Sequence, residues 1–117
     1  MRAYELMIIF RGDLAPDEVD EPLRRAVSAL AALGVEVDPD RINRWPKRRF
    51  AYEIDHRSEG YYVVLEFVSS AADFSGFERS LRLSDAIVRH KLIRLPAAEA
   101  ARRGLGESAP DPAPAGA

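Results

Sequence analysis

The sequence contains no cysteine and only two histidines, His56 and His90. The absence of cysteine excludes disulfide bonds, a thiol nucleophile and a Cys-ligated zinc site, and it is typical of a reducing compartment. No motif links either histidine to a nucleophile, and no pair of carboxylates has a recognisable catalytic spacing. We therefore expect no enzymatic activity, no metal and no cofactor.

Glycine clusters and long apolar runs are also missing. The seven glycines are scattered singly, so the chain has no glycine-rich phosphate loop. No apolar run approaches membrane-spanning length, and the N-terminus leads into a strand-like pattern instead of a signal peptide. With 117 residues, 47% of them hydrophobic and 31% charged, we expect one soluble globular domain in the cytoplasm.

The net charge of −2 conceals a strong segregation of charge along the chain. Residues 13–40 carry a net charge of −6, whereas residues 41–57 and 79–94 each carry +4. The nine residues from Arg41 to Arg49 include five cations, one tryptophan and no acid. The acids near residue 20 suit the N-terminus of a helix, with a metal site as the less favoured alternative. The basic segments indicate an anionic partner.

Hydrophobic periodicity predicts the order strand, helix, strand, strand, helix, strand. The second strand is interrupted at Pro39, and at Pro46 it either bends or sits on an edge of the sheet. The first helix either follows a short turn at 16–19 or starts with Asp20 as its cap and Pro22 in its first turn. The predicted strands are 3–10, 35–54, 61–68 and 87–95, and the predicted helices are 14–33 and 69–83. This is the α+β, ferredoxin-like βαββαβ pattern, with a four-stranded antiparallel sheet and two helices on one face. The other face would be free for a partner.

One domain boundary follows from composition. Residues 1–96 contain all the periodic segments and are predicted to form the folded domain. Residues 97–117 are rich in alanine and proline, and we expect a disordered tail with at most one fraying helical turn at 97–103.

RNA-recognition motifs share this topology and stack bases on aromatic residues of the third strand. Their glycine-and-aromatic signature is absent here, because the strand reads Gly60-Tyr-Tyr-Val-Val-Leu-Glu-Phe67. Tyr61 and Tyr62 are therefore interpreted as packing residues. Recognition of an RNA backbone through arginine and lysine is favoured over the reading of single-stranded bases.

Four segments in order resemble ribosomal protein six of the bacterial small ribosomal subunit: Met1-Arg-Ala-Tyr-Glu5, Trp45-Pro-Lys-Arg-Arg-Phe-Ala-Tyr-Glu-Ile54, Gly60-Tyr-Tyr62 and Leu83-Ser-Asp-Ala-Ile-Val-Arg-His-Lys-Leu-Ile-Arg94. The resemblance implies a non-enzymatic constituent of the small subunit. It also implies pairing with small-subunit ribosomal protein eighteen and binding of the pair to the central domain of small-subunit ribosomal RNA. The family usually has glycine where this chain has Pro46, and more often leucine where it has Phe50, which we expect to change only core volume.

The candidate contacts to RNA or to the protein partner come from both arguments. The resemblance points by position to Arg2, Lys47, Arg48, Arg49, Arg89 and Arg94. The basic segments add Arg44, Trp45 and Lys91, with Trp45 anchoring the bend. We expect these residues to form a single anion-facing side. The alternatives are a protein-interaction module that pairs through a sheet edge without RNA, and an enzyme or metabolite sensor suggested by the fold alone.

Overall fold

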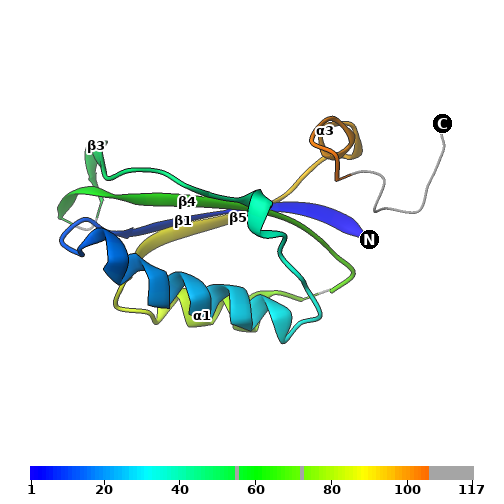
Figure 1. Ribbon diagram of the computed structural model, residues 1–117, viewed down its shortest axis with the longest axis horizontal. Helices are drawn as coiled ribbons and strands as arrows, with labels where there is room; N and C mark the ends of the chain where they lie inside the picture. The colour runs from blue at the N-terminus through cyan, green and yellow to red at the C-terminus, as the bar shows by residue number, and fades with distance from the viewer. Residues whose placement is uncertain (55, 72, 106–117) are drawn as a thin grey trace.

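The computed structural model describes residues 1–54, 56–71 and 73–105 (Figure 1). The strand β1 (Arg2–Arg11) lies inside an antiparallel sheet, with β4 (Arg57–Ser69) paired along one edge and β5 (Ile87–Arg94) along the other. The free edge of β4 pairs first with β2 (Ile42–Arg44) and then with β3 (Arg48–Ile54). The resulting order, β2-β4-β1-β5, is that of the predicted ferredoxin-like fold when β2 and β3 are counted as one strand.

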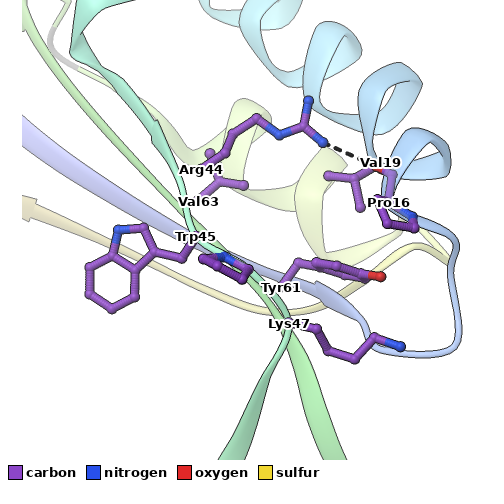
Figure 2. Close-up of a pocket in the computed structure, with 8 residues that line it drawn as sticks. Pro16, Val19, Arg44, Trp45, Lys47, Tyr61 and Val63 are labelled. Carbon is purple, nitrogen blue, oxygen red and sulfur yellow. Dashed lines mark hydrogen bonds between the residues drawn. The ribbon is translucent and has the colours of Figure 1, made fainter.

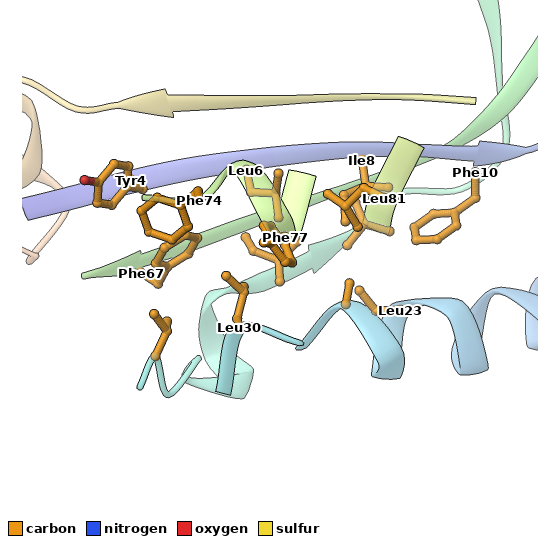
Figure 3. Close-up of a cluster of buried hydrophobic side chains, with 14 of the residues drawn as sticks. Tyr4, Leu6, Ile8, Phe10, Leu23, Leu30, Phe67, Phe74, Phe77 and Leu81 are labelled. Atoms are coloured by element: carbon orange, nitrogen blue, oxygen red, sulfur yellow. The ribbon is translucent and has the colours of Figure 1, made fainter. Parts of the chain in front are cut away.

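The core lies between the sheet and two helices on one of its faces (Figure 3). Alternate residues of β1 project into it, namely Tyr4, Leu6, Ile8 and Phe10. The helix α1 (Asp20–Ala31) contributes Leu23 and Leu30, and α2 (Ser75–Arg82) contributes Phe77 and Leu81. Full burial of one such side chain stabilises the fold by about 1.5–3 kcal/mol, so this layer supplies most of the driving force for folding.

The boundaries of the first helix lie at residues that favour a helix start and a helix end. A short 3₁₀ helix, η1 (Pro16–Val19), precedes α1, and Pro22 falls in the first turn of α1, where no backbone N–H is needed. Gly34 follows the helix with φ +84°, and the Val35 N–H donates to the Leu30 carbonyl at 3.0 Å. A positive φ directly after a helix is the conformation in which glycine is the favoured residue. The predicted turn at 16–19 and the stop at Gly34 are confirmed.

Two predicted elements are shorter in the structure. The segment 35–37 is not a strand, because Val35 packs into the core directly after the helix and a second 3₁₀ helix, η2 (Pro39–Arg41), leads into β2. The second helix begins at Ser75 instead of residue 69. Ser69 ends β4 and its hydroxyl accepts from the Ala71 N–H at 2.9 Å. Within the described residues the sheet therefore has five strands, since the long predicted second strand is divided.

A third helix, α3 (Ala97–Arg102), lies on the sheet face opposite α1 (Figure 1). It ends at Gly104, whose φ is +78°, and the Leu105 N–H donates to the Ala100 carbonyl at 2.8 Å. Leu95, Ala100 and Leu105 are buried together with Ala3. The helical turn expected at 97–103 is present as α3, but because these apolar side chains dock on β1, the expected fraying and disorder are wrong for residues 97–105. The rest of the predicted tail, 106–117, lies outside the described residues.

Candidate binding surface

A β-bulge divides the second strand at the centre of the basic segment. The strand β2 ends at Arg44, which lies opposite Val63, and β3 begins at Arg48, which lies opposite Gly60. Between these pairs the chain places three residues, Trp45–Lys47, against two residues of β4. One extra residue reverses the alternation of side chains. As a result Arg44 belongs to the helix-covered face and Arg48 to the opposite face.

Trp45 fastens this bulge to the opposite face of the sheet. Its backbone N–H donates to the Tyr62 carbonyl at 2.9 Å, and its indole ring stacks on the Tyr62 ring with centroids 6.0 Å apart. The Arg48 guanidinium carbon lies 5.0 Å from the centroid of the Trp45 ring, within the range of a cation–π interaction. Trp45 keeps 38% of its surface exposed, so the stacked pair also presents an aromatic and cationic surface to solvent.

Phe50 belongs to the same aromatic cluster and not to the helix-covered core. Its ring meets the Tyr62 ring edge-on, with centroids 6.0 Å apart. It closes over Gly60, where a Cβ atom would come within 2.8 Å of Phe50 Cζ and 2.7 Å of the Phe10 carbonyl oxygen. The expectation that phenylalanine at this position changes only core volume is wrong, because the side chain shapes the outer face beside the bulge.

On the helix-covered side, the bulge and η1 enclose a pocket of about 590 Å³ (Figure 2). Its lining residues are Pro16, Val19, Arg44, Trp45, Pro46, Lys47, Tyr61 and Val63. Lys47 Nζ lies 5.5 Å from the centroid of the Tyr61 ring, and the Tyr61 hydroxyl donates to the Leu14 carbonyl at 2.9 Å. The pocket exists because the chain turns out of the strand at Pro46, which has no N–H to donate to β4.

The nine candidate residues are divided among three places instead of forming one side. Trp45, Arg48, Arg89 and Lys91 lie on the face opposite α1, as the pairing of Arg89 with Ile9 and of Lys91 with Met7 requires. Arg44, Lys47 and Arg49 lie around the other side of the bulge. Arg2 and Arg94 lie at the far end of the sheet, opposite Ser69 and Tyr4, about 23–30 Å from Arg11 along β1.

Intramolecular contacts occupy some of the cations. Arg44 donates to the Asp20 carboxylate at 2.5 Å and to the Pro16 carbonyl at 3.1 Å. Arg41, in the same basic segment, donates to Glu66 at 3.0 Å and to the Arg103 carbonyl at 2.5 Å. The partners lie more than 20 residues away in sequence, so the basic run itself gives no sign of these contacts. Sequence reasoning likewise missed Pro16 as a wall of the pocket.

The remaining cations near the bulge are more available to a partner. Lys47 Nζ lies 3.8 Å from a Glu59 carboxylate oxygen, which is longer than a hydrogen bond. In the part of the chain that the structure describes, Arg48, Arg89 and Lys91 form no ion pair with a carboxylate. Their charge is therefore presented to solvent on the face that α1 leaves uncovered.

Other kinds of site find no support in the described ranges. No group of three or more His, Cys, Asp or Glu side chains there could hold a metal ion. The His90 side chain is almost buried and its Nε2 lies 2.9 Å from a Glu78 oxygen, which joins β5 to α2. His56 occupies a turn with φ +63°. No helix between residues 1 and 105, positions 55 and 72 aside, is long and apolar enough to cross a membrane.

Known proteins resemble this chain over nearly its whole described length. The small ribosomal subunit protein bS6 of Carboxydothermus hydrogenoformans is 42% identical over 94 residues, which cover 80% of this chain and 96% of the relative. The bS6 of Micrococcus luteus is 37% identical over 94 residues, covering 80% and 91%. A crystal structure of 30S ribosomal protein S6 from Thermotoga maritima superposes with a TM-score of 0.76 at 26% identity, covering 88% of this chain and 95% of that one.

Fold and relatives together define a ribosomal protein of the small subunit. The family described as Ribosomal protein S6 matches residues 3–94. The chain belongs to the ribosomal protein S6 family, which confirms the resemblance carried by its sequence. It is a structural constituent of the small subunit, a ribonucleoprotein component that serves translation in the bacterial cytoplasm, rather than a catalyst.

Proposed function

We propose that the protein binds the central domain of small-subunit ribosomal RNA together with small-subunit ribosomal protein eighteen. The observation that carries the proposal is the cationic group Lys47, Arg48 and Arg49, held at the bulge by the stacking of Trp45 on Tyr62. These cations belong to a chain of net charge −2, so three of them in consecutive positions around the bulge favour an anionic partner.

Phosphate neutralisation is the physical basis of the proposed contact. Each RNA phosphate paired with a lysine or arginine releases condensed counterions, so the logarithm of the binding constant falls by roughly 0.7–0.9 per phosphate against the logarithm of salt concentration. Three cations predict a contribution of about 2–3 to this slope. Stacking and strand pairing hold the bulge before RNA arrives, which lowers the entropy lost on binding.

The protein partner would occupy the sheet face opposite α1. Between the bulge and α3 this face offers half-buried apolar side chains, Met7 and Val64, with Tyr62 at the bulge end. Arg89 and Lys91 border it along β5. An apolar floor with a polar rim is the usual composition of a protein interface, and the RNA-binding cations lie at its edge.

The test compares binding of a central-domain RNA fragment, in the presence of small-subunit ribosomal protein eighteen, by the native chain and a variant with Lys47, Arg48 and Arg49 all changed to Gln. The variant should fold normally, by circular dichroism, and lose most of its RNA affinity at low salt. A matched control changes three exposed cations of the helices, Arg24, Arg25 and Arg79, to Gln and should bind nearly as the native chain does.

Failure of the native chain to bind this RNA with its partner present would contradict the proposal. Equal losses in the two variants would show that only overall charge matters. Normal RNA binding by the Lys47, Arg48 and Arg49 variant would favour a protein-interaction module in which these cations do not contact RNA.

A further inference from the structure

We propose that the pocket between the bulge and η1 receives one unstacked nucleotide of the bound RNA, with the base between its apolar walls and the phosphate at Lys47. This inference rests on the proposed RNA binding and assigns a second kind of contact to it. The bulge cations Lys47, Arg48 and Arg49 would neutralise the backbone, whereas the pocket would hold a single base.

The walls of the pocket are apolar, flat and fixed. Val19 and Val63 form its floor, each only 1% exposed, and both belong to the main core. The rings of Pro16 and Pro46 line it with that of Tyr61, which its hydroxyl ties to the Leu14 carbonyl. Unpaired bases stack on such flat rings, and the volume of about 590 Å³ lies in the range that takes a small ligand.

The polar groups at the pocket have two different roles. The Arg44 guanidinium is held by Asp20 at 2.5 Å and by the Pro16 carbonyl at 3.1 Å, so it forms part of a rigid and nearly neutral wall. The Lys47 side chain is 40% exposed, and its ammonium lies 3.8 Å from the Glu59 carboxylate. A phosphate oxygen at hydrogen-bond distance would compete well with that long contact.

Charge favours a nucleotide over an apolar side chain of a protein partner. Arg49 lies on the same side of the bulge as Lys47, so a polyanion bound to these two cations would pass the pocket mouth. Figure 2 shows Lys47 beside the Tyr61 ring, with the Trp45 indole directed away from them. A base held against Pro16 and the exposed edge of Tyr61, which is 8% exposed, would place its own phosphate near Lys47, a cation that an apolar side chain would not use.

The first test titrates the native chain with adenosine and uridine 5′-monophosphates, with inorganic phosphate as the comparison. Methyl resonances of Val19 and Val63 report the pocket floor. Both mononucleotides should shift these resonances, and phosphate alone should leave them in place. Absence of any shift with the mononucleotides, or equal shifts with phosphate, would overturn the proposal.

The second test fills the pocket without changing charge. Pro16→Trp places an indole at the mouth, and Pro39→Trp makes the same change at the first residue of the other 3₁₀ helix, away from the bulge. Because one stacked base is lost, Pro16→Trp should bind RNA about tenfold more weakly, with an unchanged dependence on salt. Pro39→Trp should bind RNA with the affinity of the native chain. Circular dichroism confirms folding of both.

The outcomes separate this proposal from the proposed function. Equal RNA binding by the two tryptophan variants would overturn the pocket assignment while RNA binding itself stands. Loss of affinity for the protein partner in the absence of RNA, specific to Pro16→Trp, would show that the pocket holds a side chain of that partner. Absence of RNA binding by the native chain would instead reject the proposed function.

Discussion

The strongest prediction about stability concerns Arg103, which fastens α3 to the sheet. Its Nη1 donates to Glu5 at 3.1 Å and to Glu66 at 3.0 Å, and its Nε donates to Glu99 at 2.7 Å. These bonds raise the pKa of Arg103, with the bond to Glu99 as the largest cause. Glu5 and Glu66 lie directly opposite each other on β1 and β4, so their carboxylates need this cation between them.

The expected cost of Arg103→Met follows from these contacts. Each charged hydrogen bond contributes about 1.5–3 kcal/mol when buried, but pairs exposed to water contribute only about 0.2–1 kcal/mol. The Arg103 side chain is 29% exposed, between these limits, and Arg41 still bonds Glu66 in the variant. We expect the free energy of unfolding to fall by about 2 kcal/mol, which lowers Tm by about 8–16 °C in a domain of this size.

Thermal unfolding of the full chain, followed by circular dichroism, measures this difference. Arg102→Met is the matched control, because the Arg102 side chain is 70% exposed and bonds only Glu99 among the described residues. That control should lose less than about 0.5 kcal/mol. Equal melting temperatures for the two variants would refute the claim that α3 belongs to the folded domain through Arg103.

Three further predictions follow from single contacts. Gly104→Ala should destabilise the protein by about 1 kcal/mol or more, because the φ of Gly104 is +78°. Gly76→Ala, in the exposed first turn of α2, should instead stabilise the protein by about 0.4–1 kcal/mol. Urea unfolding measures both changes. Leu6→Ala removes a side chain that is fully buried and should cost about 2–5 kcal/mol in the same assay. Hydrogen bonds from Arg103, the larger cause, and from Arg102 lower the pKa of Glu99 below its ordinary 4.5. The contribution of Glu99 to the stability of the fold is therefore complete above pH 4.5 and is lost as the pH falls through the lowered pKa. The acid limb of a plot of Tm against pH should therefore flatten in Arg103→Met.

Much of the fold could be predicted because its signals are local. The alternation of Tyr4, Leu6, Ile8 and Phe10 predicts a strand with one buried face, and Gly34 predicts the end of the first helix. The split βαβ order then determines the sheet. The docking of α3 escaped prediction, because a tail rich in alanine and proline is typical of disorder and its ion pairs join residues far apart in sequence.

The candidate surface was predicted in composition but not in geometry. The run of cations around Trp45 indicates an anionic partner, yet only the pairing with β4 reveals the extra residue that turns Arg48 to the outer face. A bulge depends on strand register, which a single strand does not specify. Pro46 does mark the place, since it cannot donate to the sheet. The contacts of Arg41 and Arg44 with distant carboxylates have no local signature.

If the bulge cations contact RNA phosphates, they contribute to the salt dependence of RNA binding. The measurement that shows this is the slope of log K against log salt concentration for a central-domain RNA fragment, with small-subunit ribosomal protein eighteen present. Changing Lys47, Arg48 and Arg49 to Gln should make this slope less steep by about 2–3. An unchanged slope in a correctly folded variant would contradict it.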